Sequence, residues 1–268
     1  MPTPARSRDT PEPGPRIYAH RGSTVLAPEN TSAAFDLALH FHADVLETDV
    51  RLSRDGVVMV THDERLDRTT NGQGRVLDHR ATEITRLDAG HHFIDLDGRQ
   101  WRNDGARIES LDELFARYPN VHINIDIKDR SDAAAQAVAQ SIERAGREQS
   151  VTVGSFHAST LARFRQCSPQ VTTAASQSEV ARLYFSPIGP RKARTTQSHC
   201  FNYVQIPVSW WGLPLARPAF IQRAKQQGLQ MIYWTINDRS LMQRLVSAGA
   251  DGIVTDRPDV AQALLRSQ

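Results

Sequence analysis

Residues 122–128 read His122-Ile-Asn124-Ile-Asp126-Ile-Lys128, and this stretch decides the fold. Polar residues alternate strictly with isoleucines, which is the period of a β-strand whose side chains point to opposite faces. Isoleucines on one face fit against surrounding helices, so Asn124, Asp126 and Lys128 would point into the middle of a barrel. Burying such a polar line is costly unless its members are paired or bind a metal ion. A structural ion pair and a functional site are both open on this strand alone.

Short β-type runs recur along the chain and alternate with amphipathic helical patterns. The runs fall at 17–21, 45–51, 122–128, 151–156, 171–176, 203–207, 231–236 and 252–256. The helical patterns fall at 31–42, 132–146, 158–166, 177–185, 215–228, 240–248 and 258–266. This alternation predicts βαβ units and a parallel sheet, and eight strands fit a closed (β/α)₈ barrel of the TIM type. An open doubly wound sheet is the alternative, although no Gly-x-Gly-x-x-Gly motif follows any strand to cradle a dinucleotide.

An early β-hairpin is predicted where an Asp-Gly pair at 55–56 separates the second run from an apolar run at 57–63. Such a pair is a strong signal for a two-residue turn. In that register Asp49 lies directly opposite His62. Glu47 shares the same face because side chains repeat every second residue. The hairpin thus gathers two carboxylates and an imidazole.

A hard-oxygen metal site is predicted at this place. Glu47, Asp49 and Asp126 converge from adjacent strands, and no cysteine lies near them in the pattern. Three carboxylates suit Mg²⁺ or Ca²⁺ better than Zn²⁺. We therefore expect one divalent cation, Mg²⁺ or Ca²⁺, as the cofactor.

Acid–base and anion-binding groups accompany these carboxylates. His20 and Arg21 end the first predicted strand, at the rim where barrel enzymes carry their chemistry. An isolated terminal histidine is more often a helix cap or a solvent-facing residue. With His62 beside it, a base and acid pair becomes the better interpretation, since imidazoles titrate near neutrality. Arg21 and Lys128 could hold phosphoryl oxygens, one by a planar fork and one as a point charge.

The bulk properties are typical of a soluble globular protein, and the length of 268 residues is normal for a single α/β barrel domain. Apolar residues make up 40% of the 268 and charged residues 23%, which allows a large core. The net charge of +2 argues against a nucleic-acid surface. Residues 1–15 hold five prolines and no apolar run, so we expect a flexible tail before a single domain at 16–268. With no leader or membrane span recognised, the expected location is the cytoplasm.

Two further features complete the pattern. The polar segment 64–115 interrupts the strand–helix alternation, and we interpret it as a small insertion over the barrel mouth. Cys167 and Cys200 form no Cys-x-x-Cys motif, which favours two isolated thiols in a reducing compartment over a disulfide.

Together these pieces resemble the glycerophosphodiester phosphodiesterase family. The His-Arg, Glu-x-Asp and His motifs are specific in combination, and the resemblance runs in order from about residue 16 to 266. The matching motifs are His20-Arg21-Gly22, Pro28-Glu29-Asn30-Thr31, Glu47-Thr48-Asp49-Val50, Thr61-His62-Asp63, Arg68-Thr-Thr-Asn-Gly72, Asp126-Ile-Lys128, Trp234-Thr-Ile-Asn237 and Asp251-Gly-Ile-Val-Thr-Asp-Arg-Pro258.

The resemblance implies a TIM-type barrel and metal-dependent hydrolysis of glycerophosphodiesters to glycerol 3-phosphate and an alcohol. The implied roles are metal ligand for Glu47, Asp49 and Asp126, acid or base for His20 and His62, phosphate contact for Arg21 and Lys128, and an apolar substrate wall for Trp234. One departure is Asp126, where the family more often has Glu; the shorter side chain can shift the ion, bind it through water or change the preferred metal. For Asn30 and Thr31, capping of the following helix is the preferred interpretation.

Several alternatives stay open at this point. The sequence does not say which histidine is the base, or whether water or the substrate's own hydroxyl attacks phosphorus. Hydrolysis of lysophospholipids, release of a cyclic phosphate and a non-catalytic phosphate-binding module are the competing functions. The expected partner is a small-molecule diester, with neither nucleic acid nor stable membrane insertion, and the oligomeric state is undetermined.

Overall fold

A parallel barrel forms the body of the computed structural model, which describes residues 14–185 and 201–266. Its strands follow the order β6-β5-β4-β2-β1-β11-β10-β7. Their bounds are β1 (Arg16–Ala19), β2 (Val45–Leu52), β4 (His122–Ile127), β5 (Val151–Gly154), β6 (Thr172–Thr173), β7 (Tyr203–Ile206), β10 (Gln230–Tyr233) and β11 (Gly252–Thr255). Ala174 bridges in parallel to Tyr203, which nearly closes the sheet between β6 and β7. The predicted TIM-type barrel is confirmed, and the open sheet is wrong.

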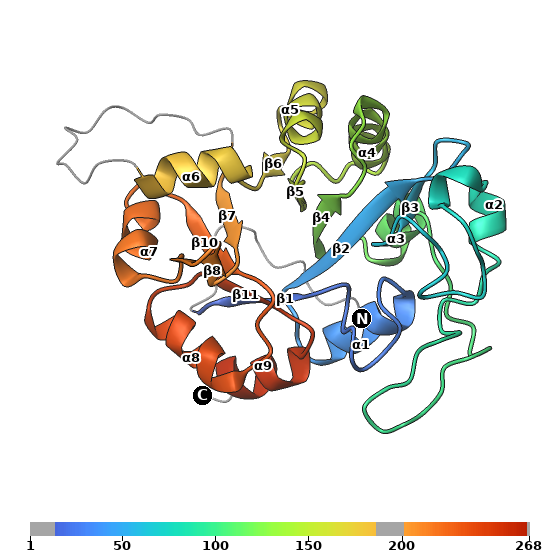
Figure 1. Cartoon of the computed structure of the whole chain (residues 1–268), viewed down its shortest axis with the longest axis horizontal. Helices are drawn as coiled ribbons and strands as arrows, with labels where there is room; N and C mark the ends of the chain where they lie inside the picture. The colour runs from blue at the N-terminus through green and yellow to red at the C-terminus, as the bar shows by residue number, and fades with distance from the viewer. Residues whose placement is uncertain (1–13, 186–200, 267–268) are drawn as a thin grey trace, which may run out of the picture.

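Helices surround the strands on the outside (Figure 1). They are α1 (Ser32–His40), α3 (Leu111–Arg117), α4 (Asp132–Arg144), α5 (Ala158–Cys167), α6 (Gln177–Phe185), α7 (Pro218–Lys225), α8 (Arg239–Ser247) and α9 (Pro258–Leu265). The side chains of Thr31, Ser131 and Asp238 accept backbone N–H groups of the first turns and so cap α1, α4 and α8. Thr31, and not Asn30, is therefore the cap of α1.

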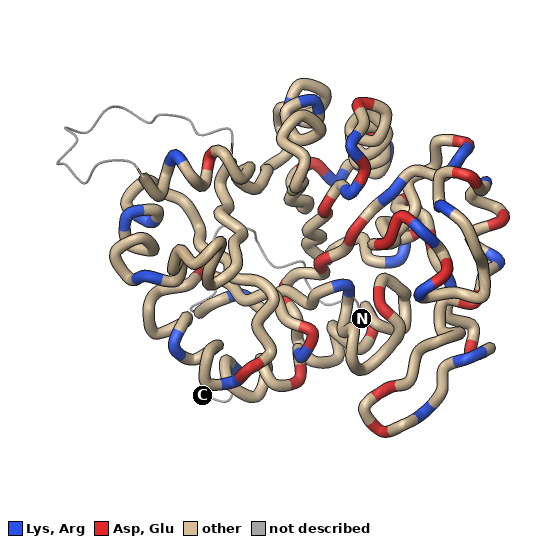
Figure 2. The backbone as a smooth tube through the Cα atoms, viewed as in Figure 1, with Lys and Arg blue, Asp and Glu red and all other residues tan. Residues whose placement is uncertain are grey.

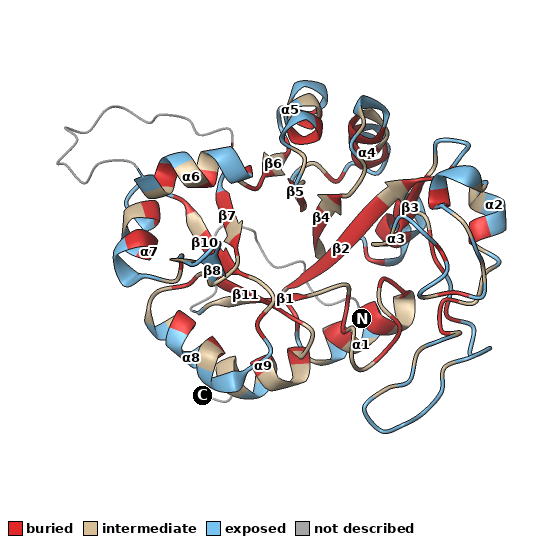
Figure 3. Cartoon of the chain, viewed as in Figure 1, coloured by how far each residue is buried: buried red, intermediate tan, exposed pale blue. Residues whose placement is uncertain are grey.

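The two faces of the barrel strands bury different groups. Ile123, Ile125 and Ile127 are at most 1% exposed and pack toward the helices, as the alternation predicted. A second, smaller cluster that includes Tyr18 and Ile232 fills the barrel interior. The strands are accordingly the most deeply buried part of the described chain (Figure 3).

The predicted hairpin exists, but its predicted register is wrong by one residue. β3 (Val58–Val60) pairs antiparallel with β2, and Val50 faces Val60. Continued along the strands, this register brings Thr61 and not His62 opposite Asp49.

A longer loop causes the shift. The N–H of Ser53 donates to the carbonyl oxygen of Val57 at 2.9 Å, which closes a loop of three residues. Gly56 ends this loop with a φ of 79°, a left-handed conformation that glycine adopts without strain. The Ser53 hydroxyl also accepts the N–H of Val57 at 3.0 Å, so the wider loop is fixed by side-chain contacts.

The segment 64–115 forms a small lobe beside β3, with η1 (Val76–Asp78) and α2 (Ala81–Ile84). Its apolar side chains pack on Met59 of β3 and form their own cluster. No residue of 64–115 lines the cavity that holds the predicted site residues. The lobe therefore packs on β3, which pairs with the last residues of β2, and its expected position over the barrel mouth stays a prediction.

Some expectations fall outside these observations. Most of the predicted flexible tail at 1–15, and Cys200, lie outside the described residues. Cys167 is an exposed free thiol. Among the helices that the structure describes, none has the length and apolar character needed to cross a bilayer.

Candidate active site

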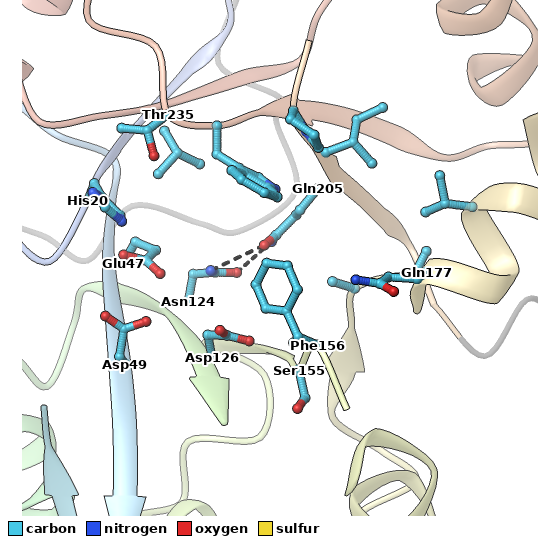
Figure 4. Close-up of a pocket in the computed structure, with 18 of the residues that line it drawn as sticks. His20, Glu47, Asp49, Asn124, Asp126, Ser155, Phe156, Gln177, Gln205 and Thr235 are labelled. Atoms are coloured by element: carbon cyan, nitrogen blue, oxygen red, sulfur yellow. Dashed lines mark hydrogen bonds between the residues drawn. The ribbon is translucent and has the colours of Figure 1, made fainter. Parts of the chain in front are cut away.

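One cavity of about 320 Å³ opens among the carboxyl ends of the barrel strands (Figure 4). One side of it is ionisable: His20, Arg21, Glu47, Asp49, His62, Asp126 and Lys128. The other side, as far as the described residues line it, carries no charge and includes Phe156, Gln205, Trp210 and Trp234. We call these the charged side and the neutral side. Every site residue predicted from the sequence lines this cavity, so the structure brings them all together.

His20 follows β1 and is held by a carboxylate from the far end of the chain. Its Nδ1 lies 2.6 Å from Oδ1 of Asp256, just after β11. Asp256 also accepts the Thr24 hydroxyl at 2.6 Å and the Asn237 amide at 2.7 Å. Burial opposes ionisation, yet these contacts lower the pKa of Asp256 to about 2. An ionised carboxylate can only accept, so Nδ1 of His20 carries the proton and Nε2 is left for other chemistry.

The pKa of His20 is itself raised. Burial acts to lower it, but the hydrogen bond to Asp256 and the negative charge of Glu47 outweigh the burial. The imidazole therefore binds a proton more readily than an isolated histidine does.

His62 follows β3 and has a similar partner. Its Nδ1 lies 2.6 Å from Oδ1 of Asp63. The guanidinium of Arg68, from the lobe, contacts Asp63 and also binds both carboxylate oxygens of Glu29 at 2.7 and 2.8 Å. Although burial raises it, the pKa of Asp63 falls to about 2 because Arg68 and His62 bind its charged form. The same tautomer follows for His62 as for His20.

Contacts of both the backbone and the guanidinium hold Arg21 in place. Its φ of 50° is left-handed, and its N–H donates to Oε2 of Glu47 at 3.0 Å. Its Nη1 donates to Glu29 at 2.9 Å, while Nε lies 2.9 Å from Oδ2 of Asp49. That last contact is an ion pair without hydrogen-bond alignment, so the buried Nε–H has no acceptor in the described structure. Arg21 therefore keeps one donor unused at the cavity.

The glycine after Arg21 is required by the turn. Gly22 has a φ of 88°, and a Cβ at this position would lie 2.6 Å from Cβ of Ala34 in α1. Any larger residue would both strain the backbone and push α1 away. The His-Arg-Gly motif is thus a tight connection between β1 and the helix that follows.

Asn30 fastens two parts of the site rather than capping a helix. Its backbone N–H donates to the carbonyl oxygen of Arg21 at 2.9 Å. Its side-chain oxygen accepts the Thr48 hydroxyl at 2.8 Å, and its amide lies 3.4 Å from Asp49. With a φ of 56°, a conformation that asparagine tolerates, it ties the turn after β1 to β2.

Lys128 joins two of the predicted metal ligands. Its Nζ lies 2.8 Å from Asp49 and 2.6 Å from Asp126. Burial acts to raise the pKa of Asp49, but the charges of Lys128 and Arg21 lower it. For Asp126 burial prevails and raises the pKa in spite of Lys128. The strand alternation at 122–128 thus places a cation between two neighbouring carboxylates.

Glu47 is a buried carboxylate that forms no ion pair with any described residue. It is 7% exposed, and within the described residues it forms no ion pair. Burial and the nearby charge of Asp49 raise its pKa well above the ordinary value. A cation bound beside Glu47 would remove this cost.

The three carboxylates are the type of donor that a divalent cation prefers, but they are not arranged around one point. Glu47, Asp49 and Asp126 are hard oxygen donors, and β2 and β4 pair Asp49 with Asp126. However, no three His, Cys, Asp or Glu side chains of the described part are arranged to hold an ion. In this arrangement the ammonium of Lys128 contacts both aspartates.

The neutral side is built from aromatic and amide groups. Trp234, after β10, meets the ring of Phe156 edge to face, with centroids 5.7 Å apart. Gln205 donates to Asn124 across the barrel at 2.6 Å, which satisfies both amides. Trp234 therefore lies on an apolar wall of the cavity, at the position the sequence predicted for it.

Some functional contacts escaped the sequence analysis. Asp63, Arg68 and Asp256 stand inside the quoted motifs, but no role was predicted for them. The signal for Asp63 was its place beside His62, and for Asp256 its place at the end of the last strand. Acidic residues at strand ends thus indicated histidine partners as well as the predicted metal ligands.

Comparisons with known proteins agree with this architecture. The profile described as "Glycerophosphoryl diester phosphodiesterase family" matches residues 20–260. A glycerophosphodiester phosphodiesterase of Bacillus altitudinis is 33% identical over 252 residues, 92% of this chain and 96% of that protein. Another, from Caldanaerobacter subterraneus subsp. tengcongensis, is 30% identical over 262 residues, 93% of this chain and 97% of that one. A crystal structure of a glycerophosphodiester phosphodiesterase from Agrobacterium tumefaciens has a TM-score of 0.76 at 29% identity, with 93% and 99% coverage.

Proposed function

The chain belongs to the glycerophosphoryl diester phosphodiesterase family and is a phosphoric diester hydrolase, and we propose that it hydrolyses glycerophosphodiesters in a metal-dependent reaction. The products would be glycerol 3-phosphate and an alcohol. His20 and His62 would transfer the protons, and a single divalent cation, Mg²⁺ or Ca²⁺, would serve as cofactor.

One observation carries the proposal: two histidines at one cavity each bind an aspartate through Nδ1. Both imidazoles therefore keep Nε2 for the substrate, with the tautomer and ring orientation fixed by the aspartate. One neutral imidazole accepts the proton of the attacking oxygen, and the other, protonated, donates to the leaving alkoxide. Proton transfer of this kind contributes roughly 10² to 10⁴ in rate.

The phosphoryl group would lie between the cationic residues. Arg21 offers the buried Nε–H that lacks an acceptor, and Lys128 offers an ammonium that now neutralises Asp49 and Asp126. Both groups can hold phosphoryl oxygens, the guanidinium with direction and the ammonium as a point charge.

Glu47, Asp49 and Asp126 would hold the divalent cation, which when bound withdraws negative charge from the phosphoryl oxygens. Glu47 is suited to this because it is buried and has no ionic partner in the described part of the chain. The two aspartates are shared with Lys128, so we expect cation and ammonium to compete for them. That Asp126 stands where the family more often has Glu makes its part in the ligand set a point to test.

A coupled assay for released glycerol 3-phosphate tests the proposal. Glycerophosphocholine, glycerophosphoethanolamine and glycerophosphoglycerol would be incubated with Mg²⁺, with Ca²⁺ and with a chelator. We expect product with a cation, none with the chelator, and recovery when the cation is restored. A cyclic phosphate among the products would identify the substrate hydroxyl as the nucleophile, and its absence would favour water.

The same assay separates the competing functions. Substrate bound without turnover in either cation would indicate a non-catalytic phosphate-binding module and contradict the proposal. Lysophosphatidylcholine is included because the apolar wall around Trp234 would also accept an acyl chain; faster turnover of that lipid would redefine the substrate. The single domain at 16–268 and the cytoplasmic location stay predictions.

A further inference from the structure

Aromatic side chains surround the cavity mouth on its neutral side. Phe156 and Trp210 line the cavity yet are 52% and 38% exposed, and Trp211 is 90% exposed. All three lie at the barrel end where the candidate active site opens. The remaining large exposed apolar residues in the described part are Phe185 at the end of α6 and three aliphatic residues in the lobe.

A tight hairpin presents Trp211. β8 (Ser209–Trp210) pairs antiparallel with β9 (Leu213–Pro214), and this pairing leaves only Trp211 and Gly212 in the turn. Both turn residues have positive φ, 49° and 80°, which is the pattern of a type I′ turn. The first position of such a turn favours asparagine, and a tryptophan there is strained. The fold therefore holds a large aromatic group outward at a place where its own stability favours a small polar one.

The charge around the hairpin is one-sided. The described residues 180–185 and 201–237 contain four Lys or Arg residues and no Asp or Glu, in a chain with 32 basic and 30 acidic residues; one of the four, Lys225, pairs with Asp251. Among these, Arg217 follows the hairpin, directly precedes α7 without a side-chain capping bond, and is exposed. Figure 2 shows α7 with basic segments and no acidic one. A surface that meets this face without repulsion is an anionic one.

We infer that the face formed by Phe156, Trp210, Trp211 and Arg217 docks on an anionic lipid surface. Tryptophan prefers the region between hydrocarbon and water, where its ring is buried and its N–H stays hydrated. Basic side chains beside it add attraction to anionic headgroups. Docking in this way turns the cavity mouth toward the lipid without any segment crossing the bilayer.

A second copy of the chain is the less suitable occupant. Three aromatic side chains bury about 150–250 Å² each, which together fall short of the roughly 800 Å² per partner in a stable interface. A lipid surface has no such requirement, because shallow insertion of one or two aromatic residues and charge attraction act together.

The substitution Trp211→Asn tests the inference. Because asparagine suits the type I′ turn, the variant is expected to be at least as thermally stable as the wild type. Trp211 does not line the cavity, so turnover of a water-soluble glycerophosphodiester should be unchanged. Binding to sedimented vesicles of phosphatidylcholine and phosphatidylglycerol should weaken by about tenfold, since an aromatic side chain no longer enters the interface.

Matched variants make the result specific. Leu96→Asn removes another apolar side chain, 59% exposed in a turn of the lobe, and should bind vesicles like the wild type. Arg217→Glu should weaken binding to anionic vesicles, and added salt should weaken binding of the wild type. Equal binding by wild type and Trp211→Asn, or no binding by the wild type, would overturn the inference. So would a change from dimer to monomer in Trp211→Asn by sedimentation velocity, which would assign the face to a second copy. None of these outcomes depends on whether the diester is hydrolysed.

Discussion

On the charged side of the cavity, side chains are held in place by contacts between ionisable groups. On the neutral side, they are held by the packing of uncharged groups. On the charged side, Lys128 bridges two aspartates, and Arg21 contacts Glu29 and Asp49. On the neutral side, Trp234 meets Phe156 through ring edges. Buried charges are costly unless paired, so each group on the charged side restrains its neighbours. We therefore expect substitutions there to change the rate of the reaction, and substitutions on the neutral side to change mainly the affinity.

The largest contrast is expected from Glu47→Gln. Loss of this ligand should lower turnover by roughly 10³-fold, because charge neutralisation by a metal ion contributes several kcal/mol to the transition state. Since burial raises the pKa of Glu47, a neutral glutamine should not reduce thermal stability. Release of glycerol 3-phosphate, a melting curve and calorimetric titration with Mg²⁺ would be compared with Glu64→Gln, an exposed carboxylate in the lobe. Unchanged Mg²⁺ affinity in Glu47→Gln would remove this residue from the ligand set.

A smaller loss is expected from Asp256→Asn, which keeps the size of the side chain but removes its charge. Turnover should fall by about 10²-fold, because His20 loses the group that fixes its tautomer and stabilises its protonated form. The hydrogen bond to Asp256 raises the pKa of His20, so the limb of the pH–rate profile due to His20 should move to lower pH.

Asp259→Asn provides the control for this variant. Asp259 lies three residues after Asp256 in the sequence and does not line the cavity. Its carboxylate accepts a hydrogen bond from Arg257. The pH–rate profile of the Asp259→Asn variant should match that of the wild type. An Asp256→Asn profile that also matches would mean that Asp256 supports only the fold.

The sequence predicted the direction of strand side chains better than it predicted contacts between distant parts of the chain. The alternation in 122–128 sufficed to predict that Asn124, Asp126 and Lys128 face the cavity, because strand geometry alone decides it. The partner of His20 could not be predicted in this way. Asp256 is 236 residues away in sequence, and only closure of the barrel between β1 and β11 brings the two together.

Local contacts explain two further features that the sequence pattern did not predict, the hairpin register and the packing of the lobe. The hairpin register depended on whether Ser53 or Arg54 pairs with Val57 to close the loop, and the hydroxyl of Ser53 favours the longer loop. Asp-Gly suits both lengths, so the sequence pattern did not distinguish them. Likewise the lobe was predicted as an insertion, but its placement follows from packing on Met59, which no periodicity reveals.

The smallest effect is expected on the neutral side. Trp234→Leu should raise KM by about fivefold and leave kcat nearly unchanged, since it removes an apolar wall and one ring contact of roughly 1 kcal/mol. Steady-state kinetics with glycerophosphocholine would show this split. A collapse of kcat with KM unchanged would mean that the two sides do not divide the work as described.

The most direct test of two-histidine catalysis is turnover of His20→Ala and His62→Ala at saturating cation. Each variant should lose roughly 10² to 10⁴ in kcat, and far-ultraviolet circular dichroism and thermal melting should show an intact fold. Wild-type kcat in either folded variant would contradict the role of that imidazole in proton transfer.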